Sequence, residues 1–257
     1  SKMKLKFLGT GTSQGIPVIG STHPVCLSTD QKDKRLRSSV MITDDDGKKI
    51  LIDCGPDFRQ QMLTNKENTV DALLVTHEHN DHIIGLDDLR PIIFQKKQDV
   101  SIYCLPRVGN EIKNRFPYAF SEIKYPGAPS FQLNFINEEI FKLGNTEITP
   151  INVLHHQLPI LGFKIKNLVY ITDASNISEE EKWKLKNLDF LIINCLRKTE
   201  PHIAHYILPE ILELVEELQP KTTYLTHISN KFGFHQEIEN ELPEHIRPAY
   251  DGLEIEF

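Results

Sequence analysis

The sequence predicts a mixed α/β fold with β-sheet inside and helices outside. Short apolar runs of strand-like character alternate with helical patterns and turn signals along the chain, as in layered α/β proteins. The chain has 257 residues, of which 39% are hydrophobic, so it can bury a sizeable core. We find no internal repeat, low-complexity tract or long linker, and therefore expect residues 1–257 to form a single domain.

The chain is expected to begin with a strand and a hairpin. Lys4–Leu8 (KLKFL) is strand-like and leads into Gly9–Gly15 (GTGTSQG), which is either a plain turn or part of an active site. Val40–Thr43 and Lys49–Asp53 flank the turn sequence DDDG and predict a hairpin. A helix is expected next at Asp57–Leu63, and a buried strand at Ala72–Thr76 (ALLVT).

The rest of the chain continues this alternation. Apolar runs predict strands at Val100–Cys104, Glu147–Leu154, Phe163–Lys166, Leu168–Thr172, Phe190–Asn194 and Thr222–Thr226. Helices are expected at Val108–Phe116, Glu179–Lys186 and Pro209–Leu218. The last segment has an amphipathic stripe, because its apolar residues recur at 211, 212, 214, 215 and 218.

Composition argues against nucleic acid and membrane as partners. The net charge is −7 and the pI about 5.9, whereas binding to many phosphates needs a basic surface. The basic run KDKRLR at 32–37 is more typical of a solvated loop. No apolar run approaches the ~20 residues that span a bilayer, and the N-terminal segment lacks a signal-peptide pattern. Four scattered cysteines favour free thiols in a reducing cytoplasm: Cys26, Cys54, Cys104 and Cys195.

The strongest motif is THEHNDH, residues 76–82, directly after the predicted strand ALLVT. It contains His77, His79, Asp81 and His82, whose imidazole and carboxylate groups suit Zn²⁺, Mn²⁺ or Fe²⁺. On a turn at a strand end these donors can converge on two neighbouring ions, whereas a single helix could not aim all of them inward. A polar loop with chance histidines is the less favoured interpretation.

Further donors follow later strands, at the ends where open-sheet active sites collect. They are His155 or His156 in VLHHQLP, Asp173 after LVYIT, and His227 after TTYLT. Adjacent strand residues point to opposite faces, so only one of the paired histidines should face the site, and alternation does not say which. Asp173 could instead cap a helix, and His227 could be an ordinary core histidine.

Together these motifs resemble the metallo-β-lactamase superfamily. The resemblance covers nearly the whole chain and rests on FLGTGTSQG, LIDCGPDFR, the THEHNDH loop, GLDDLRP, LPILGF, YITDAS and YLTHIS. Within the superfamily the sequence is most similar to the PhnP-like branch, named for a phosphoribosyl cyclic phosphodiesterase. The resemblance implies an αββα sandwich of two mixed sheets flanked by helices, and it makes a homodimer an expectation.

The resemblance also implies roles for these side chains. His77, His79 and His155 would bind one divalent ion, Asp81, His82 and His227 a second, and Asp173 would bridge the two. His155 is chosen because a histidine of the family precedes the LP-[VI]-LG-[FY] stretch by three residues. His156 then takes the place of a small residue, and either turns away or joins the pocket rim. Asp53 would orient a ligand histidine, unless it only closes a turn.

The implied chemistry is hydrolysis with two divalent ions, Zn²⁺ or Mn²⁺, whose charge lowers the pKa of a bridging water and makes hydroxide available to attack phosphorus. Asp81 is therefore expected to be a catalytic residue as well as a ligand. The proton donor of the branch best matches His205 in LRKTEPHIAHY, with His202 as the alternative. Arg90 could bind phosphate or pair with a neighbouring aspartate.

One feature of the branch is incomplete here. Some members hold a further structural zinc, and the matching positions of this chain carry Ser21, His23, Cys26 and Asn230. His23 and Cys26 alone cannot complete a closed tetrahedral site, so we expect this site to be empty or only partly formed.

The predicted function is a dinuclear metal-dependent phosphodiesterase acting on a small cyclic or nucleotide-like phosphodiester. One alternative is another hydrolysis known in the superfamily, of a thioester or an RNA 3′ end. The other alternative is a non-catalytic pathway-accessory protein on the same fold. The presence of all seven implied ligands favours catalysis.

Overall fold

Two mixed β-sheets form the centre of the structure. The computed structural model describes residues 2–123 and 126–257. The first sheet has the order β14 (Glu254–Glu256), β1 (Lys4–Gly9), β2 (Ser39–Thr43), β3 (Lys49–Ile52), β4 (Ala72–Leu74), β5 (Val100–Cys104), β6 (Phe131–Phe135). The second has the order β13 (Ile246–Pro248), β12 (Thr222–Thr226), β11 (Phe190–Asn194), β10 (Leu168–Ile171), β9 (Leu158–Ile165), β8 (Thr146–His155), β7 (Phe141–Leu143).

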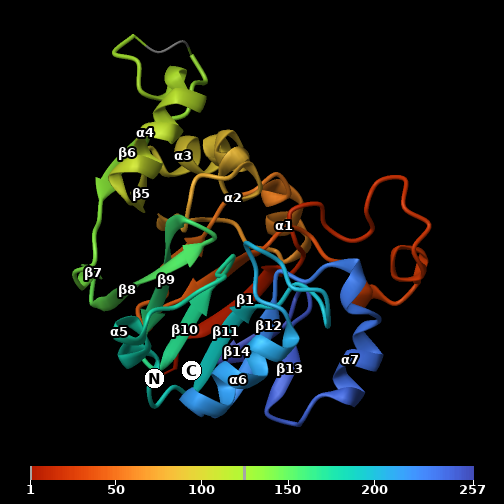
Figure 1. Cartoon of the computed structure of the whole chain (residues 1–257). Helices are drawn as coiled ribbons and strands as arrows, with labels where there is room; N and C mark the ends of the chain where they lie inside the picture. The colour runs from red at the N-terminus through yellow and green to blue at the C-terminus, as the bar shows by residue number, and fades with distance from the viewer. Residues whose placement is uncertain (1, 124–125) are drawn as a thin grey trace.

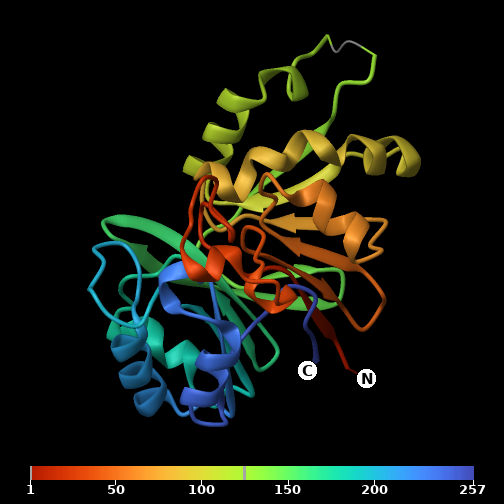
Figure 2. The same ribbon diagram turned by 90° about the vertical axis from the view of Figure 1, so that its right-hand side faces the viewer.

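Helices cover the outer face of each sheet. One set consists of α1 (Phe58–Thr64), α2 (Asn80–Ile83), α3 (Arg90–Lys96) and α4 (Pro106–Arg115). The other set consists of α5 (Glu179–Lys182), α6 (Leu208–Leu218) and α7 (His235–Glu241). Figure 1 shows the first set above the sheets and the second set below them, and Figure 2 shows the layers from the side. The predicted αββα sandwich is therefore confirmed.

Side-chain alternation along the strands explains these layers. In β3, Ile50 and Ile52 pack between the two sheets, whereas Leu51 packs toward the α1–α4 side. In β10, Tyr170 packs between the sheets and Val169 toward the α5–α7 side. Both sheets are thus covered on both faces, which is why their strands are continuous apolar runs in the sequence.

Most predicted elements are observed, and the misses have a common cause. The predicted hairpin is the antiparallel pair β2–β3, and the predicted strand at 222–226 is β12. The helices and strands absent from the sequence prediction are β6, β7, β13, β14, α2, α3 and α7, which are short or lie at sheet edges. The predicted helix at Glu179–Lys186 is an α-helix only over Glu179–Lys182, followed by the 3₁₀ segment Trp183–Leu185. Short or edge segments carry little periodic signal.

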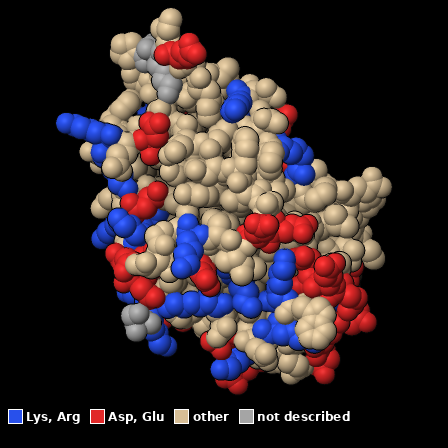
Figure 3. Space-filling view, turned by 90° about the vertical axis from the view of Figure 1, so that its left-hand side faces the viewer, with Lys and Arg blue, Asp and Glu red and all other residues tan. Residues whose placement is uncertain are grey.

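Two surface properties bear on function. Within residues 2–123 and 126–257, no helix is both long enough and apolar enough to cross a membrane. On the face shown in Figure 3, Lys and Arg side chains are interspersed with Asp and Glu side chains. That mixture gives this face no continuous basic track of the kind that follows a nucleic-acid backbone.

Candidate metal centre

The predicted donors meet at the carboxyl-terminal ends of strands from both sheets. His77 and His79 follow β4, and His155 is the last residue of β8. Asp173 follows β10, and His227 follows β12. Their donor atoms form two groups, each within 4.8 Å: His77, His79 and His155 in the first, and Asp81, His82, Asp173 and His227 in the second. All seven residues predicted as ligands therefore lie at one place.

The THEHNDH segment is not the simple turn that the sequence predicted. His79 is the N-cap of the short helix α2, so Asp81 and His82 lie on its first turns. The extended backbone of His79, with φ −64° and ψ 147°, separates the strand-side histidines from the helical pair. This change of conformation within the loop aims its donors at two different groups.

Asp173 lies between the two groups. Its Oδ2 is 3.5 Å from His77 Nε2 and 4.0 Å from His155 Nε2. Its Oδ1 is 3.1 Å from His227 Nε2 and 3.3 Å from His82 Nε2. Each oxygen of one carboxylate thus faces a different set of imidazoles, which is the arrangement a bridging ligand requires.

Hydrogen bonds set the tautomers of three histidines. His82 Nδ1 donates to Asp53 Oδ2 at 2.6 Å, and His77 Nδ1 lies 2.9 Å from Thr76 Oγ1, which itself donates to Asp53 Oδ2. His155 Nδ1 faces two carbonyl oxygens, those of Asp173 and Ala204, so it must carry the proton. Each of these rings therefore turns the lone pair of Nε2 toward the site.

Those lone pairs face carboxylate oxygens with nothing between them. His82 Nε2 is 3.1 Å from Asp81 Oδ2, and His77 Nε2 and His82 Nε2 are buried without a hydrogen-bond partner in the described parts of the chain. Two acceptors at such distances repel each other unless a proton or a cation lies between them. Imidazole nitrogen and carboxylate oxygen together are the donor set of zinc and manganese sites, so the residues fit divalent metal ions.

The electrostatics favour the same conclusion. Burial opposes ionisation of Asp173, but the neighbouring His227, His82 and His77 outweigh it and hold the pKa of this carboxyl well below its usual value. Burial lowers the pKa of His77 and of His79. The carboxylate is thus ionised and the imidazoles of His77 and His79 are neutral at pH 7, which are the protonation states that bind metals. Burial opposes a charge on His82, but Asp173, Asp81 and Asp53 outweigh it and raise the pKa of this ring well above its usual value, so a metal ion at its Nε2 would replace a proton.

The predicted supporting role of Asp53 is matched by its contacts. Asp53 is fully buried and accepts from the Thr76 amide as well as from Thr76 Oγ1 and His82 Nδ1. It has φ +64°, and Asp173 and His227 also have positive φ, of 63° and 54°. Three site residues held in this sparsely populated region indicate that the surrounding structure fixes their direction.

The structure separates the two neighbouring histidines of VLHHQLP. His155 lies in the first group, as expected from the resemblance. His156 is exposed and has φ +55°, and its amide donates to Ser175 Oγ. Because His156 is outside the strand, the alternation rule could not have decided between them. Its side chain joins the rim of the cleft beside His79 and His155, which is one of the two outcomes expected from the sequence.

His205 contacts the candidate ligands His155 and His227, and His202 contacts His205. The His205 ring centroid is 4.9 Å from that of His155 and 5.0 Å from that of His227. His202 contacts the His205 ring at 5.0 Å and accepts the Ala204 amide through Nδ1. Burial, then His227, lowers the pKa of His205 to about 3. A nitrogen of His205 also lies within 4.8 Å of donors of His155 and Asp173.

Other predicted residues have different surroundings. Arg90 Nη2 pairs with Asp87 Oδ2 at 3.1 Å, so the ion-pair alternative describes it better than a phosphate contact. The Gly9–Gly15 loop lies beside His227, because the Thr12 amide donates to the carbonyl of Ile228. His23 Nδ1 accepts the Val25 amide and thereby caps a short 3₁₀ helix.

Three contributors were missed by sequence interpretation. Thr76 links Asp53 to His77, and Asn194 Oδ1 and Nδ2 bind the amide and carbonyl of Ala174, directly after Asp173. Glu78, between two predicted ligands, pairs with Arg107 of α4. Thr76 and Asn194 are the last residues of predicted apolar strands. A polar residue at the end of such a strand was the feature of the sequence that could have identified them as supports of the site.

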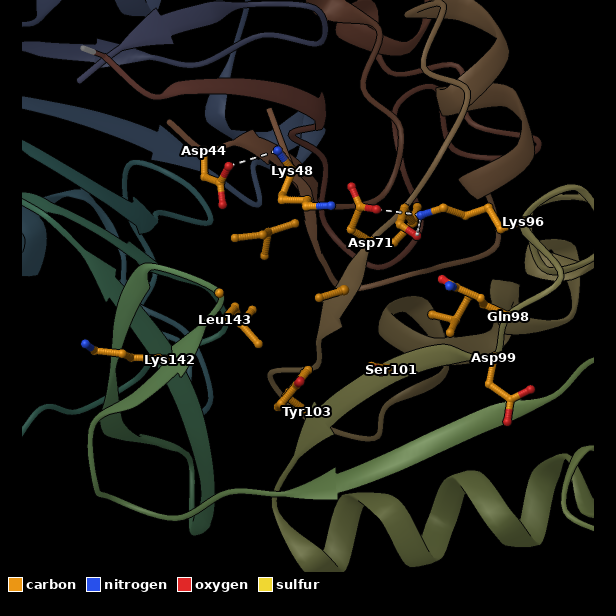
Figure 4. A pocket seen from close by; sticks show the side chains of 15 residues that line it. Asp44, Lys48, Asp71, Lys96, Gln98, Asp99, Ser101, Tyr103, Lys142 and Leu143 are labelled. Carbon is orange, nitrogen blue, oxygen red and sulfur yellow. Dashed lines mark hydrogen bonds and ion pairs between the residues drawn. The ribbon is translucent and has the colours of Figure 1, made fainter. Parts of the chain in front are cut away.

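Two cavities differ in their relation to this centre. A cleft of about 460 Å³ lies next to the first group and is lined by His79, His155, His156, Gln157, Leu158 and Ala204. A second cavity, of about 300 Å³ and shown in Figure 4, lies where β3, β4 and β5 begin. Its lining has three lysines and three aspartates, and none of the seven candidate ligands. Of these two cavities, the first can present a substrate to the metal centre.

Comparisons with known proteins agree with this architecture. Residues 48–228 match the family described as the β-lactamase superfamily domain. The chain is 37% identical to a solved diphosphatase of the PhnP family, with 100% and 98% of the two chains covered and a TM-score of 0.93. It therefore belongs to the metallo-β-lactamase superfamily. The PhnP-like branch expected from the sequence is confirmed by the solved diphosphatase.

Two curated relatives widen the comparison. The chain is 40% identical to an octanoyltransferase of Porphyromonas gingivalis over 98% of its own length and 51% of that protein. It is 27% identical to a ribonuclease Z of Methanococcus maripaludis over 65% of its length and 49% of that protein. The chain thus spans about half the length of the curated relatives it matches.

Proposed function

We propose that this chain is a metal-dependent hydrolase that cleaves a small phosphodiester, cyclic or nucleotide-like, with two divalent ions, Zn²⁺ or Mn²⁺. The observation that carries the proposal is the Asp173 carboxylate, whose two oxygens face two separate groups of imidazoles. Family membership supports metal-dependent hydrolysis. The similarity to a PhnP-family diphosphatase and to ribonuclease Z supports a phosphorus ester as the substrate.

In this proposal the ligand sets are those predicted from the sequence. His77, His79 and His155 would hold one ion, Asp81, His82 and His227 would hold the other, and Asp173 would be shared between them. When bound, such ions supply Lewis-acid chemistry, since they acidify water and neutralise phosphate oxygens. Asp53 holds His82 directly and His77 through Thr76, so that Nε2 of each stays directed at its ion.

We assign His205 as the group that protonates the leaving oxygen. Its ring lies between His155 and His227, and its Nδ1 is buried without a hydrogen-bond partner among the residues described. The ring therefore faces the place where a phosphodiester beside both groups would be broken. Burial, then His227, lowers the pKa of its ring to about 3, so in this role His205 would carry the proton only when the negative charge of a bound phosphodiester raises that pKa. As a positioned acid His205 should then contribute about 10²–10⁴-fold to the rate. In His205→Ala we expect turnover to fall by that factor while bound metal stays unchanged. Loss of metal would identify His205 as a ligand instead.

The cleft suits a small substrate. Its volume of about 460 Å³ is in the range of small-molecule sites. Its lining contains no Lys or Arg, and the chain carries a net charge of −7. We therefore propose a small molecule as the substrate, with neither nucleic acid nor a membrane as partner. The homodimer implied by the resemblance stays a prediction.

A second candidate is hydrolysis of an acyl thioester. The 40% identical relative from Porphyromonas gingivalis is called an octanoyltransferase, although about half of that protein lies outside the match. The cleft lining includes the apolar side chains of Leu158 and Ala204, which can contact an acyl chain. The same metal centre can polarise a thioester carbonyl, so both candidates share the ligands and differ in the substrate.

One assay separates these candidates. Purified protein with Mn²⁺ or Zn²⁺ should hydrolyse bis(p-nitrophenyl) phosphate, and a panel of ribose cyclic phosphates and cyclic nucleotides should contain a better substrate. Asp81→Ala should abolish this activity. Hydrolysis of an octanoyl thioester without phosphodiester cleavage would favour the second candidate. If wild type and Asp81→Ala are equally inert on both substrate classes, a non-catalytic role on this fold is favoured.

A further inference from the structure

Helix α4 reaches the metal-binding loop through two arginines. Arg107 and Arg115 lie near opposite ends of the helix, and both contact Glu78. Glu78 is the residue between the candidate ligands His77 and His79, and its side chain is 12% exposed. The pattern of the sequence gave no reason to connect residue 78 with a helix that begins at Pro106.

Arg107 joins the two segments that supply one group of ligands. Its Nε donates to Glu78 Oε2 at 2.7 Å and its Nη2 to Glu78 Oε1 at 3.1 Å, a two-pronged ion pair. The same Nη2 donates to the carbonyl of Pro159 at 2.7 Å. Pro159 pairs with Leu154, the neighbour of His155, in the β8–β9 hairpin. One guanidinium therefore connects the His77–His79 loop with the His155 hairpin.

Arg115 fixes the backbone of the same loop. Its Nη1 donates to the carbonyl oxygen of Glu78 at 2.6 Å and to Asn80 Oδ1 at 2.7 Å. These contacts lie on either side of His79. A charged donor on a backbone carbonyl limits rotation of the adjoining peptide units, so the direction of the His79 side chain depends on α4.

Among the three histidines of the first group, His79 is the one whose ring no hydrogen bond orients. His77, His82 and His155 are each oriented by a hydrogen bond through Nδ1. For the exposed ring of His79, the described residues provide ring contacts with His77 and His155 but no hydrogen bond. Its Nε2 and Nδ1 are placed by the backbone of the loop, and that backbone is tied to Glu78.

We propose that Arg107, assisted by Arg115, is a positioning residue that sets the metal affinity of the His77–His79–His155 group selectively. Asp53 holds His82 of the second group directly and His77 of the first through Thr76, whereas Arg107 contacts only segments that carry ligands of the first group. This inference rests on the proposed metal-dependent function. It adds that the first ion has a support that the second lacks, so that it can be weakened by itself.

The test is a Zn²⁺ titration of metal-free Arg107→Gln against wild type, followed by calorimetry and checked by elemental analysis of bound metal. We expect one of the two binding steps to weaken by about 10–100-fold, the usual effect of removing a group that orients ligands. The other step should keep its wild-type affinity. Arg107→Lys should recover part of the loss, because an ammonium group can pair with Glu78 but lacks the fork that also reaches Pro159.

Arg90→Gln is the matched control. Arg90 also forms an ion pair with an acidic residue, Asp87, but its side chain is 43% exposed and does not contact the loop ligands. Both binding steps should be unchanged in this variant. The thermal unfolding midpoint of each metal-free variant shows whether a general loss of stability contributes. If Arg107→Gln does not fold, Glu78→Gln tests the same contact from the other side.

A pairwise comparison assigns the weakened step to its ligands. His79→Ala and Arg107→Gln combined should weaken binding no further than His79→Ala alone, because both act on one group. In the double variant His227→Ala and Arg107→Gln, the losses of metal affinity of the two single variants should add in full, because the two residues act on different groups. Unchanged affinities in Arg107→Gln, or equal weakening of both steps, would overturn the inference. If wild type itself binds no divalent ion, the proposed function fails instead.

Discussion

The two halves of the metal centre are built in different ways. One half comes from a single segment, the loop after β4 together with α2, where four donors occur within residues 77–82. The other half takes single donors from three separated strand ends, His155, Asp173 and His227. Side chains support the loop half, as Asp53 and Arg107 demonstrate. Backbone carbonyls and the side chain of Asn194 support the strand-end half.

The support of the strand-end half has two parts. His155 Nδ1 donates to the carbonyls of Asp173 and Ala204, so one strand end orients a ligand from another. Asn194 holds both polar groups of Ala174. The difference has a mechanical consequence. A loop needs orienting side chains because its backbone has no ladder of hydrogen bonds, whereas the sheet fixes donors at strand ends. Substitutions of supporting side chains should therefore affect the loop half more.

The largest effect is expected where the halves meet. Asp173→Ala removes the carboxylate whose two oxygens face both groups. Bound metal measured by elemental analysis should fall for both ions, and hydrolysis of bis(p-nitrophenyl) phosphate should fall at least about 10³-fold, since the metal centre supplies the reactive water. By contrast, His79→Ala should reduce only one ion. Retention of both ions in Asp173→Ala would contradict the bridging role.

A smaller effect is expected from the support of the loop half. Asp53→Asn keeps the shape of the side chain, and asparagine tolerates the left-handed backbone of this position. The asparagine side chain has one acceptor oxygen, whereas the Asp53 carboxylate accepts from three donors. The substitution also removes the negative charge beside His82. Metal affinity measured by competition with a chelator should fall about 10–100-fold. Asn194→Ala is the matching substitution in the strand-end half. The loss of metal affinity should be larger in Asp53→Asn than in Asn194→Ala, if the loop half depends more on supporting side chains.

The same asymmetry determines what sequence could predict. Four donors in one loop are visible as a motif, because neighbours in sequence are neighbours in space. His155, Asp173 and His227 were chosen through the family resemblance, since each alone had an ordinary alternative. The ion pair of Glu78 with Arg107 joins residues 29 positions apart, and no local pattern reports such a contact. A mixed α/β fold with sheet inside was predictable from the apolar runs that buried strands leave, whereas the αββα arrangement came from the family resemblance.

Packing of the loop half onto its own sheet gives another prediction. A Cβ atom at Gly85 would lie 1.9 Å from the carbonyl oxygen of Gly55, and one at Gly55 would lie 2.1 Å from that of Asp81. Gly85→Ala should therefore cost about 3 kcal/mol of unfolding free energy, the upper part of the range for overpacking. Gly47→Ala, where no atom lies within 4 Å but φ is +79°, should cost about 1–2 kcal/mol. Chemical denaturation of the metal-free proteins measures both.

The last prediction concerns the pH dependence of stability and a histidine outside both halves of the metal centre, His235. It separates the acid sensitivity of the fold from that of the metal centre. His235 is buried, and its Nδ1 accepts from Arg35 Nη2 at 3.1 Å. Burial, then the charge of Arg35, lowers the pKa of His235 to about 4. Between pH 6.5 and 4 the unfolded chain therefore binds a proton that the folded chain does not, so stability falls as the pH falls.

From pH 7.5 to pH 5 this group alone should remove about 2 kcal/mol of unfolding free energy. Gln in place of His235 keeps an acceptor for Arg35 and does not titrate, so His235→Gln should flatten the pH dependence of denaturant unfolding by that amount. The exposed His245→Gln serves as the control and should leave the slope unchanged. If His235→Gln and wild type lose stability in parallel, the acid sensitivity belongs to groups other than His235.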